Sequence, residues 1–322
     1  MRSEERDILP IKERIAQFRM TLDGRSIPIG VGCAWMTDCI KDGNDAPALL
    51  RRCYDEGFRF FDTASDYGDS EDVVGAFLRG IDRKSVFLST KSPYYGKTLG
   101  AEEAFPKFRE AFYRSFDRLG TEHIDLYLIH DTNNIQICEK EVLPFLQEQR
   151  EKGLIDYFGM GTRSLQAHEE GICTGAIQAS ENYLTYSILK RSAAGVIRMA
   201  AEHGVAWINA SPLHFGKLKD EDPLAQAAVS TGGRRREWEM AAKMQALCRE
   251  MGVDIIAAAL QYSLLNPDVD MSLNGIRRPS NLESTLRALR TPIYPDQWAR
   301  IFSMQRTDPC MEIEDALWYK FL

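Results

Sequence analysis

The stretch FFDTASDYGDSE, residues 60–71, decides how the rest of the chain is interpreted. It places an acid, Asp62, at the end of a short apolar strand and a tyrosine, Tyr67, in the loop that follows. The phenol of a free tyrosine has a pKa of about 10, so a tyrosine that transfers protons near neutral pH needs a nearby cation to stabilise its phenolate. That cation must come from another part of the chain.

Two further apolar runs also end in residues that carry chemistry. VFLSTK (86–91) ends in Lys91, and IDLYLIH (124–130) ends in His130. In a barrel of parallel strands, the C-terminal strand ends all open on one face, and this face carries the active site. The three strand ends are therefore predicted to meet Tyr67 there, and Lys91 supplies the cation that the tyrosine needs.

The chain is long enough for one large α/β domain. With 322 residues, of which 44% are hydrophobic, it can bury a large core, and a single α/β barrel takes about 250 residues plus insertions. Short apolar runs alternate with amphipathic stretches, the pattern of a parallel sheet with helices between its strands. Strands are predicted near 29–33, 58–62, 86–90, 124–129, 156–160, 176–179, 205–209 and 269–274, and helices include 45–56, 70–79, 102–119, 139–152, 190–203 and 280–290. The count of eight strands predicts a (β/α)8 TIM barrel.

The N-terminal residues, the segment before strand eight and one long insertion remain to be assigned. Residues 1–17 are charged and are expected to form a peripheral N-terminal extension, while residues 18–322 form a single domain. An alternating stretch with the turn signal Asp23-Gly24 predicts a β-hairpin. The alanine-rich run 253–265 is long enough for a helix before strand eight, and residues 213–233 are predicted to be a long loop after strand seven, of a length that is uncommon unless functional.

Four motifs in this order resemble the aldo-keto reductase superfamily. They are the Asp-Thr-Ala strand end, the Tyr-Gly that follows, the Ser-Thr-Lys strand end and the Leu-x-x-x-His strand end, and the likeness extends from about Phe18 to Leu289. The resemblance implies that an N-terminal hairpin closes the barrel bottom and that the catalytic tetrad is Asp62, Tyr67, Lys91 and His130. In the implied mechanism Asp62 fixes Lys91, Lys91 lowers the pKa of Tyr67, and Tyr67 exchanges a proton with the substrate oxygen while His130 orients it.

The same resemblance implies a set of cofactor-binding residues, several of which depart from the family pattern. Strand five ends in Gly-Met-Gly-Thr-Arg where Gly-x-Ser-Asn is usual, and Ala-Ser-Pro-Leu (210–213) replaces Tyr-Ser-Pro-Leu, a form similar to the L-galactose and aldose 1-dehydrogenase branch. The residues expected to bind the nicotinamide half are Thr162, Arg163 and Gln178. Those expected to bind the pyrophosphate and adenosine half are Ser211, Leu213, Gly275, Arg277, Asn281 and Thr285.

The choice between the two nicotinamide cofactors rests on the loop after strand eight. By resemblance, members that prefer NADP often carry a lysine where this chain has Gly275. Arg277 points the other way, because a guanidinium can bind the 2′-phosphate of NADP through a charge-assisted bidentate contact. NADP(H) is therefore the expected cofactor, with NAD(H) also usable. The alternative for this residue is a solvated loop arginine.

The resemblance implies hydride transfer between nicotinamide C4 and a carbonyl or sugar hemiacetal carbon. Trp35, Tyr94 and Trp318 are candidates for the substrate pocket, although aromatic residues also pack as plain core. The alternative is a binding protein that keeps the cofactor site and senses redox state. Such a protein can lose the tyrosine or the lysine of the tetrad, and this chain keeps both.

Charge and composition exclude several other classes of protein. A net charge of -7 argues against a nucleic acid or an anionic membrane as a partner, since both call for a basic face. No apolar run reaches the roughly 18 residues of a membrane span. Seven scattered cysteines suit free thiols in a reducing compartment, so a cytoplasmic location is expected. The histidines lack the spacing of metal ligands, and no metal site is predicted.

Overall fold

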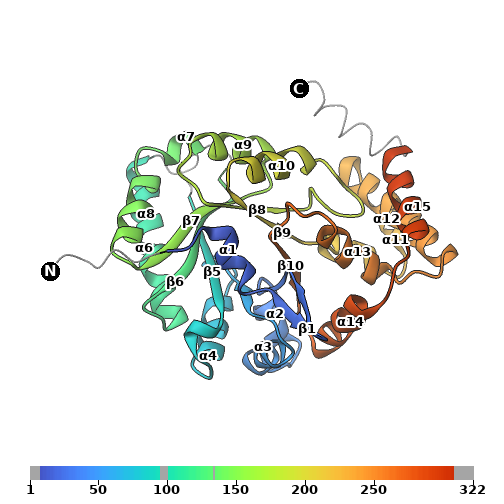
Figure 1. Cartoon of the computed structure of the whole chain (residues 1–322), viewed down its shortest axis with the longest axis horizontal. Helices are drawn as coiled ribbons and strands as arrows, with labels where there is room; N and C mark the ends of the chain where they lie inside the picture. The colour runs from blue at the N-terminus through green and yellow to red at the C-terminus, as the bar shows by residue number, and fades with distance from the viewer. Residues whose placement is uncertain (1–7, 95–100, 133–134, 308–322) are drawn as a thin grey trace.

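A closed barrel of eight parallel strands forms the centre of the molecule. The computed structural model describes residues 8–94, 101–132 and 135–307. Figure 1 shows the strands around the centre with helices outside them. The strands follow the order β10-β3-β4-β5-β6-β7-β8-β9, so that each pairs with the next along the chain and the last closes on the first. The predicted (β/α)8 TIM barrel is confirmed.

Seven of the eight barrel strands lie close to their predicted positions. The sixth was expected at 176–179 but begins where that range ends, so that Gln178 precedes the strand and Glu181 lies within it. The barrel strands are β3 (Ile29–Gly32), β4 (Phe60–Asp62), β5 (Phe87–Pro93), β6 (Ile124–His130), β7 (Ile155–Gly161), β8 (Ala179–Tyr183), β9 (Ala206–Ala210) and β10 (Met271–Gly275).

Helices cover the outside of the barrel, and local caps explain several of their boundaries. The Asp45 side chain accepts the backbone N–H of Ala48 at 3.0 Å and so begins α3. Five helices, α2, α7, α9, α12 and α15, lie outside the predicted ranges, whereas α13 matches the helix expected over 253–265. The helices are α2 (Met36–Lys41), α3 (Ala46–Asp55), α4 (Ser70–Leu78), α6 (Ala101–Leu119), α7 (Ile135–Cys138), α8 (Val142–Glu151), α9 (Leu165–Cys173), α10 (Ala194–Glu202), α12 (Gly232–Glu250), α13 (Ile255–Leu264), α14 (Pro279–Arg290) and α15 (Pro295–Thr307).

A short helix fills the end of the barrel opposite the predicted site. In α1 (Ile11–Ala16) the two isoleucines are buried, and together with Phe18 they join the hydrophobic cluster of the inward-facing strand residues. The Phe18 ring lies edge-on to Phe87 at 5.8 Å, and Figure 1 shows α1 in the middle of the ring of strands. The expectation that residues 1–17 form a peripheral extension is therefore wrong for residues 11–16, because isoleucines one helical turn apart give α1 an apolar side.

The N-terminal hairpin is present but packs elsewhere. Strands β1 (Met20–Leu22) and β2 (Arg25–Ile27) pair antiparallel around Asp23-Gly24, whose φ angles are 50° and 75°. The apolar side chains of the hairpin belong to the outer cluster, which lies between strands and helices. The bottom of the barrel is thus closed from inside by α1, with the hairpin beside it.

Residues 213–233, expected to be a long loop, are mostly helical. They contain the 3-10 segment η2 (His214–Lys219), helix α11 (Pro223–Ala228) and the start of α12. Asp222 caps α11 by accepting the backbone N–H of Ala225 at 3.0 Å. The charged residues that suggested a loop instead form the exposed side of these helices and their ion pairs.

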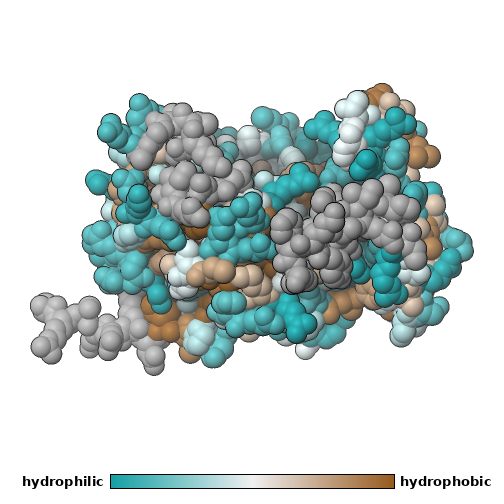
Figure 2. Space-filling view, turned by 90° about the horizontal axis from the view of Figure 1, so that it is seen from above, coloured by the Kyte–Doolittle hydropathy of each residue, from teal (hydrophilic) through white to brown (hydrophobic). Residues whose placement is uncertain are grey.

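Hydrophilic residues cover most of the side of the molecule seen in Figure 2, with smaller hydrophobic areas between them. The exposed large hydrophobic residues include Trp35 and Phe215, which lie at the mouth of the cavity described below. Among the described residues, none of the helices combines the length and the apolar character needed to cross a membrane.

Candidate active site

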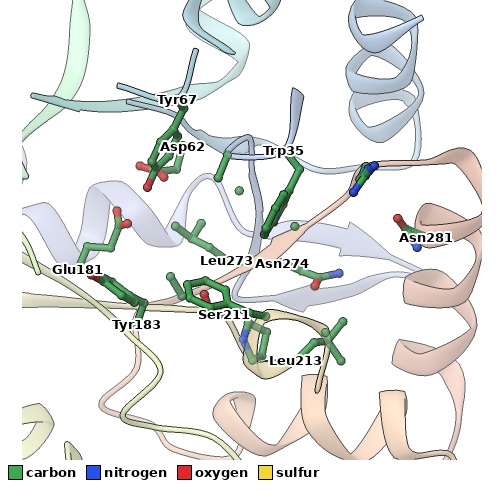
Figure 3. A pocket seen from close by; sticks show the side chains of 18 of the residues that line it. Trp35, Asp62, Tyr67, Glu181, Tyr183, Ser211, Leu213, Leu273, Asn274 and Asn281 are labelled. Atoms are coloured by element: carbon green, nitrogen blue, oxygen red, sulfur yellow. The ribbon is translucent and has the colours of Figure 1, made fainter. Parts of the chain in front are cut away.

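A cavity of about 740 Å³ lies at the C-terminal ends of the barrel strands. In Figure 3, Asp62, Tyr67 and Glu181 gather at one end of this cavity, Asn281 lies at the other, and Trp35 stands between them. Most of the residues predicted from sequence reach it, and Lys91 lies buried behind the wall. The predicted residues that line the cavity are Trp35, Asp62, Tyr67, His130, Ser211, Leu213, Gly275, Arg277 and Asn281.

Lys91 lies in a buried cluster with two carboxylates. Its Nζ is 2.5 Å from Asp62 Oδ2 and 3.0 Å from Glu181 Oε1, and the side chains of the three residues are 1%, 4% and 5% exposed. The ammonium also donates to the Thr63 carbonyl at 3.1 Å. Burial alone lowers the pKa of Lys91, but the two carboxylates and Tyr67 hold that pKa well above its ordinary value. These neighbours therefore favour the protonated, cationic form of Lys91.

Tyr67 stands over this cluster in the loop after β4. Its ring centroid is 5.2 Å from Lys91 Nζ, and its ring lies edge-on to that of His130 at 5.4 Å. Burial raises the pKa of Tyr67, Lys91 lowers it, and the neighbouring carboxylates, Glu181 first among them, raise it further. The phenol is thus held in its protonated form, with one buried cation available to stabilise the phenolate.

His130, the last residue of β6, lies between two acids that flank the cavity. Its Nδ1 is 3.0 Å from Asp66 Oδ1, and its Nε2 is 3.9 Å from Asp131 Oδ2. Burial raises the pKa of Asp66, but the hydrogen bond and charge of His130 bring it below its ordinary value. Asp131 also accepts a hydrogen bond from the Tyr183 hydroxyl at 3.0 Å. The imidazole is thereby held in one orientation.

The far end of the cavity is basic and lies at the N-terminus of α14. Arg277 donates to Asp42 through Nε at 2.8 Å and Nη2 at 2.7 Å, and Arg278 donates to the same carboxylate at 2.8 Å. The two arginines lower the pKa of Asp42 to about 2. Lys219 lies close enough that both arginines, after burial, lower its pKa. Asn281 caps α14 by accepting the backbone N–H of Arg278 at 3.2 Å.

The chain between these two ends passes through residues in a left-handed backbone conformation. Ser211, His214 and Phe215 have φ angles of 62°, 53° and 54°, which non-glycine residues rarely adopt. Glu237 of α12 holds this segment through an ion pair with Lys217 and a 3.6 Å contact with His214. The segment that carries Ser211 and Leu213 is thus held by Glu237, and these two residues border the middle of the cavity.

Gly275 is required by its neighbour Trp35. A side chain at position 275 would place its Cβ 2.9 Å from Trp35 Cδ1, so a lysine there would displace the indole. Trp35 in turn lies edge-on to Phe215 at 6.5 Å. The glycine at this position is thus explained by packing alone.

Three residues expected at the nicotinamide half do not line the cavity. Thr162 is buried just after β7, and Arg163 pairs with Glu237 at 3.5 Å. Gln178 lies at the opposite end of the barrel: its Oε1 accepts the backbone N–H of Phe158 at 3.1 Å. The expectation for Gln178 is wrong because the sixth strand begins after this residue, not before it.

Thr285 and Tyr94 also lie away from the cavity. Thr285 is buried in α14, where its hydroxyl donates to the Asn281 carbonyl at 2.7 Å and accepts from Asn274 at 2.8 Å. Tyr94 belongs to the outer hydrophobic cluster and lies edge-on to Phe108 at 6.3 Å. Both are packing residues, contrary to expectation. Trp318 lies outside the described residues.

Several residues of the site were missed by the sequence interpretation. Asp66 is inside the opening motif, one residue before Tyr67, and could have been found there. Glu181 and Tyr183 belong to the strand that was placed too early, and Asp42 precedes its partner Arg277 by 235 residues, so no local pattern joins them.

One acidic group elsewhere in the barrel has the geometry of metal ligands. His123, Asp125 and Asp156 lie at the N-terminal ends of β6 and β7 with ligand atoms within 4.8 Å of one another. The Asp125 carboxylate, however, already accepts Arg83 Nη2 at 2.6 Å and lies 3.7 Å from Arg14 Nη2. These residues form an ion-pair network that ties α1 to the barrel.

Known proteins resemble this chain over most of its length. D-threo-aldose 1-dehydrogenase of Pseudomonas sp. is 26% identical over 309 residues, which cover 86% of this chain and 94% of that protein. L-galactose dehydrogenase of Arabidopsis thaliana is 26% identical over 256 residues, covering 76% and 78%. An aldo-keto reductase from Bacillus halodurans, solved in its holo form, shares the fold with a TM-score of 0.70 at 24% identity over 89% of this chain and 95% of that chain. The profile of the Aldo/keto reductase family matches residues 28–306, and the chain is therefore a member of this family of nicotinamide-dependent oxidoreductases.

Proposed function

We propose that this protein transfers a hydride between C4 of NAD(P) and the carbon of a carbonyl or a sugar hemiacetal. The observation that carries this proposal is the position of Tyr67 over Lys91, with 5.2 Å between the ring centroid and Nζ. The cavity beyond them reaches a basic helix N-terminus, which suits the phosphates of a dinucleotide. The bound nicotinamide would supply or accept the hydride.

Tyr67 is the general acid and base. In reduction its hydroxyl donates a proton to the substrate oxygen, and in oxidation its phenolate takes that proton back. Lys91 stabilises the phenolate by its charge, and Asp62 holds Lys91 at 2.5 Å. Because burial and the acids keep the phenol protonated, the cation is what makes the oxidative direction accessible.

His130 orients the substrate oxygen. Asp66 holds Nδ1 at 3.0 Å, and this contact directs Nε2 towards the cavity beside the Tyr67 ring. A hydrogen bond from the imidazole would fix the oxygen at the point where the phenol can reach it. The imidazole and the phenol are close enough to contact the same oxygen, because the His130 and Tyr67 rings meet edge-on with centroids 5.4 Å apart.

The remaining residues of the cavity suit the length of a dinucleotide. Ser211 and Leu213 would hold the pyrophosphate, and Asn281 and Arg277 would hold the adenosine half at the start of α14. Tyr183 supports the nicotinamide end: it is the register partner of Ala210 in the sheet, where the usual aromatic residue is missing. NADP(H) is preferred and NAD(H) is also used, because Arg277 can bind a 2′-phosphate but is shared with Asp42.

The surroundings of Tyr67 favour a neutral polyhydroxylated substrate. Asp66 and Asp131 place two acids beside the cavity, where they can accept hydrogen bonds from sugar hydroxyls. Trp35 and Phe215 offer exposed aromatic faces for the apolar side of a sugar ring. The two sugar dehydrogenases among the relatives agree with this class of substrate, and we propose an aldose 1-dehydrogenase type of activity.

Purified protein mixed with each of the four nicotinamide cofactors and a panel of aldehydes and aldoses tests the proposal. Absorbance of the reduced nicotinamide should change with at least one neutral aldose, and the Tyr67→Phe variant provides the matched control. Cofactor binding without turnover of any compound would contradict the proposal and favour the redox-sensing alternative.

A further inference from the structure

Glu181 is a buried acid in the catalytic cluster that the proposed mechanism does not use. It lies in β8, and its carboxylate is 3.0 and 3.3 Å from Lys91 Nζ through Oε1 and Oε2. Gly161, its register partner in β7, leaves the room for this contact: a Cβ there would lie 3.3 Å from Lys91 Cδ and 3.7 Å from Glu181 Cβ. The fold thus makes space for a second acid on the same cation.

The charges of this cluster do not balance if every group is ionised. Lys91 carries one positive charge, whereas Asp62 and Glu181 would carry two negative ones, and all three side chains are buried. Burying an uncompensated charge is costly. Asp62 Oδ1 is buried and accepts no hydrogen bond within the described part of the chain, so a protonated Glu181 beside it would supply the missing donor and restore neutrality.

We propose that Glu181 is a positioning residue that holds a proton against Asp62 and so keeps the full charge of Lys91 available to the phenolate of Tyr67. With that proton in place, the Lys91 cluster is neutral and the cation stabilises the phenolate. When Glu181 loses the proton, the cluster gains a negative charge that opposes the phenolate. The part of this inference that concerns catalysis rests on the proposed function, whereas the proton on Glu181 does not.

The groups around Glu181 agree with this role. Burial first and the charge of Asp62 second raise the pKa of Glu181, while Lys91 lowers it, and the result is well above the ordinary value. Its register partners in β7 and β9, Gly161 and Ile208, are uncharged. The titratable groups that interact with its charge are Asp62 and Lys91 of the cluster, Tyr67 in the loop after β4, and Tyr183 two residues further along β8.

Infrared spectroscopy of the purified protein, without cofactor or substrate, tests the location of the proton. The difference spectrum between wild type and Glu181→Gln at neutral pH should contain the carbonyl band of one protonated carboxyl group. Glu237→Gln is the matched control, because Glu237 contacts two lysines and has a pKa far below its ordinary value. A difference spectrum with only carboxylate bands for Glu181→Gln would overturn the proposal.

The effect on Tyr67 is measured by titrating its phenolate in the ultraviolet, with Tyr67→Phe subtracted as background. Glu181, whose pKa is raised to about 8, has lost its proton at the alkaline pH where Tyr67 ionises. Removing a nearby negative charge shifts a pKa by about one unit or more, so Tyr67 should ionise at least about one pH unit lower in Glu181→Gln. Titration at the same pH in both proteins contradicts the proposal. If Glu181→Gln does not fold, Glu181→Met offers an uncharged side chain of similar length for the same two measurements.

Discussion

The two ends of the cavity hold similar ion-pair clusters in opposite surroundings. At one end Lys91 binds two acids, and all three side chains are at most 5% exposed. At the other end Asp42 binds two arginines that are 35% and 55% exposed, at nearly the same distances. Distance therefore does not separate the clusters, but burial does. A buried ion pair is strongly coupled to the stability and chemistry around it, whereas an exposed one contributes little.

The difference fits what each end has to do. In the proposed function, proton transfer needs charges whose effect on Tyr67 is little screened by water, and the burial of the Lys91 cluster supplies this. The other end, under the same proposal, selects a charged group of the cofactor and still lets the cofactor leave, and exposed arginines can exchange one anion for another. The following substitutions test whether burial indeed separates the two clusters.

The largest expected effect is on stability. Lys91→Met removes the buried cation and leaves its acids without a partner, which should cost about 3–5 kcal/mol in the free energy of unfolding. Arg278→Met makes the matched change at the exposed cluster and should cost less than about 1 kcal/mol. Urea denaturation of both variants measures the two losses. Losses of equal size would refute the contrast between the clusters.

The second effect is on turnover. Tyr67→Phe keeps the ring and its packing but removes the transferable proton, so kcat should fall by about 10²- to 10⁴-fold while cofactor affinity stays unchanged. Steady-state kinetics with a neutral aldose, together with fluorescence titration of the reduced cofactor, separates the two quantities. Near-normal turnover in this variant would show that proton transfer takes place elsewhere.

Much of the buried cluster could be predicted from sequence, for a physical reason. Strands of a parallel barrel are apolar runs of nearly fixed length, and a polar residue that ends such a run must lie at the rim. Asp62, Lys91 and His130 each end such a run, so their meeting place followed from topology alone. In the structure β4 ends at Asp62 and β6 at His130, whereas β5 continues two residues past Lys91 to Pro93.

Apart from Asp66, which is inside the opening motif, the residues that escaped prediction lack such a signal. The sixth strand, ASENY, mixes polar and apolar residues, and the more apolar residues before it shifted its predicted position. The resemblance implies Gln178 at the end of this strand, but Gln178 precedes the strand and Glu181 lies within it. Asp42 lies beside Arg277 because two loops from opposite ends of the chain pack together. No pattern in a single sequence reveals this contact. The helix α1 was missed because its two isoleucines are surrounded by charged residues.

The third effect concerns cofactor affinity at the exposed cluster. Arg277→Ala removes a charged donor for the 2′-phosphate, and a hydrogen bond to a charged group is worth about 1.5 to 3 kcal/mol, so NADP(H) affinity should fall roughly tenfold or more. NAD(H) affinity should change little, because NAD lacks that phosphate. Calorimetric titration with each cofactor gives both values. Equal losses, or a wild-type preference for NAD(H), would mean that Arg277 takes no part in the selection.

The smallest effect, and the one that most sharpens the comparison, comes from Asp42→Asn. In the wild type, Asp42 occupies the Nε and Nη2 edge of Arg277, the edge best suited to a phosphate, and its charge repels that phosphate. Asparagine removes this charge, so NADP(H) should bind a few-fold more tightly, within the limit of about 1 kcal/mol for an exposed pair, and the gain should shrink in high salt. Asp38→Asn makes the same change of net charge nearby without freeing Arg277 and should have a weaker effect. Weaker NADP(H) binding in Asp42→Asn would instead mean that Asp42 serves to order the two arginines. The ion pairs of the exposed cluster would then have a positioning role, as those of the buried cluster do, despite their exposure.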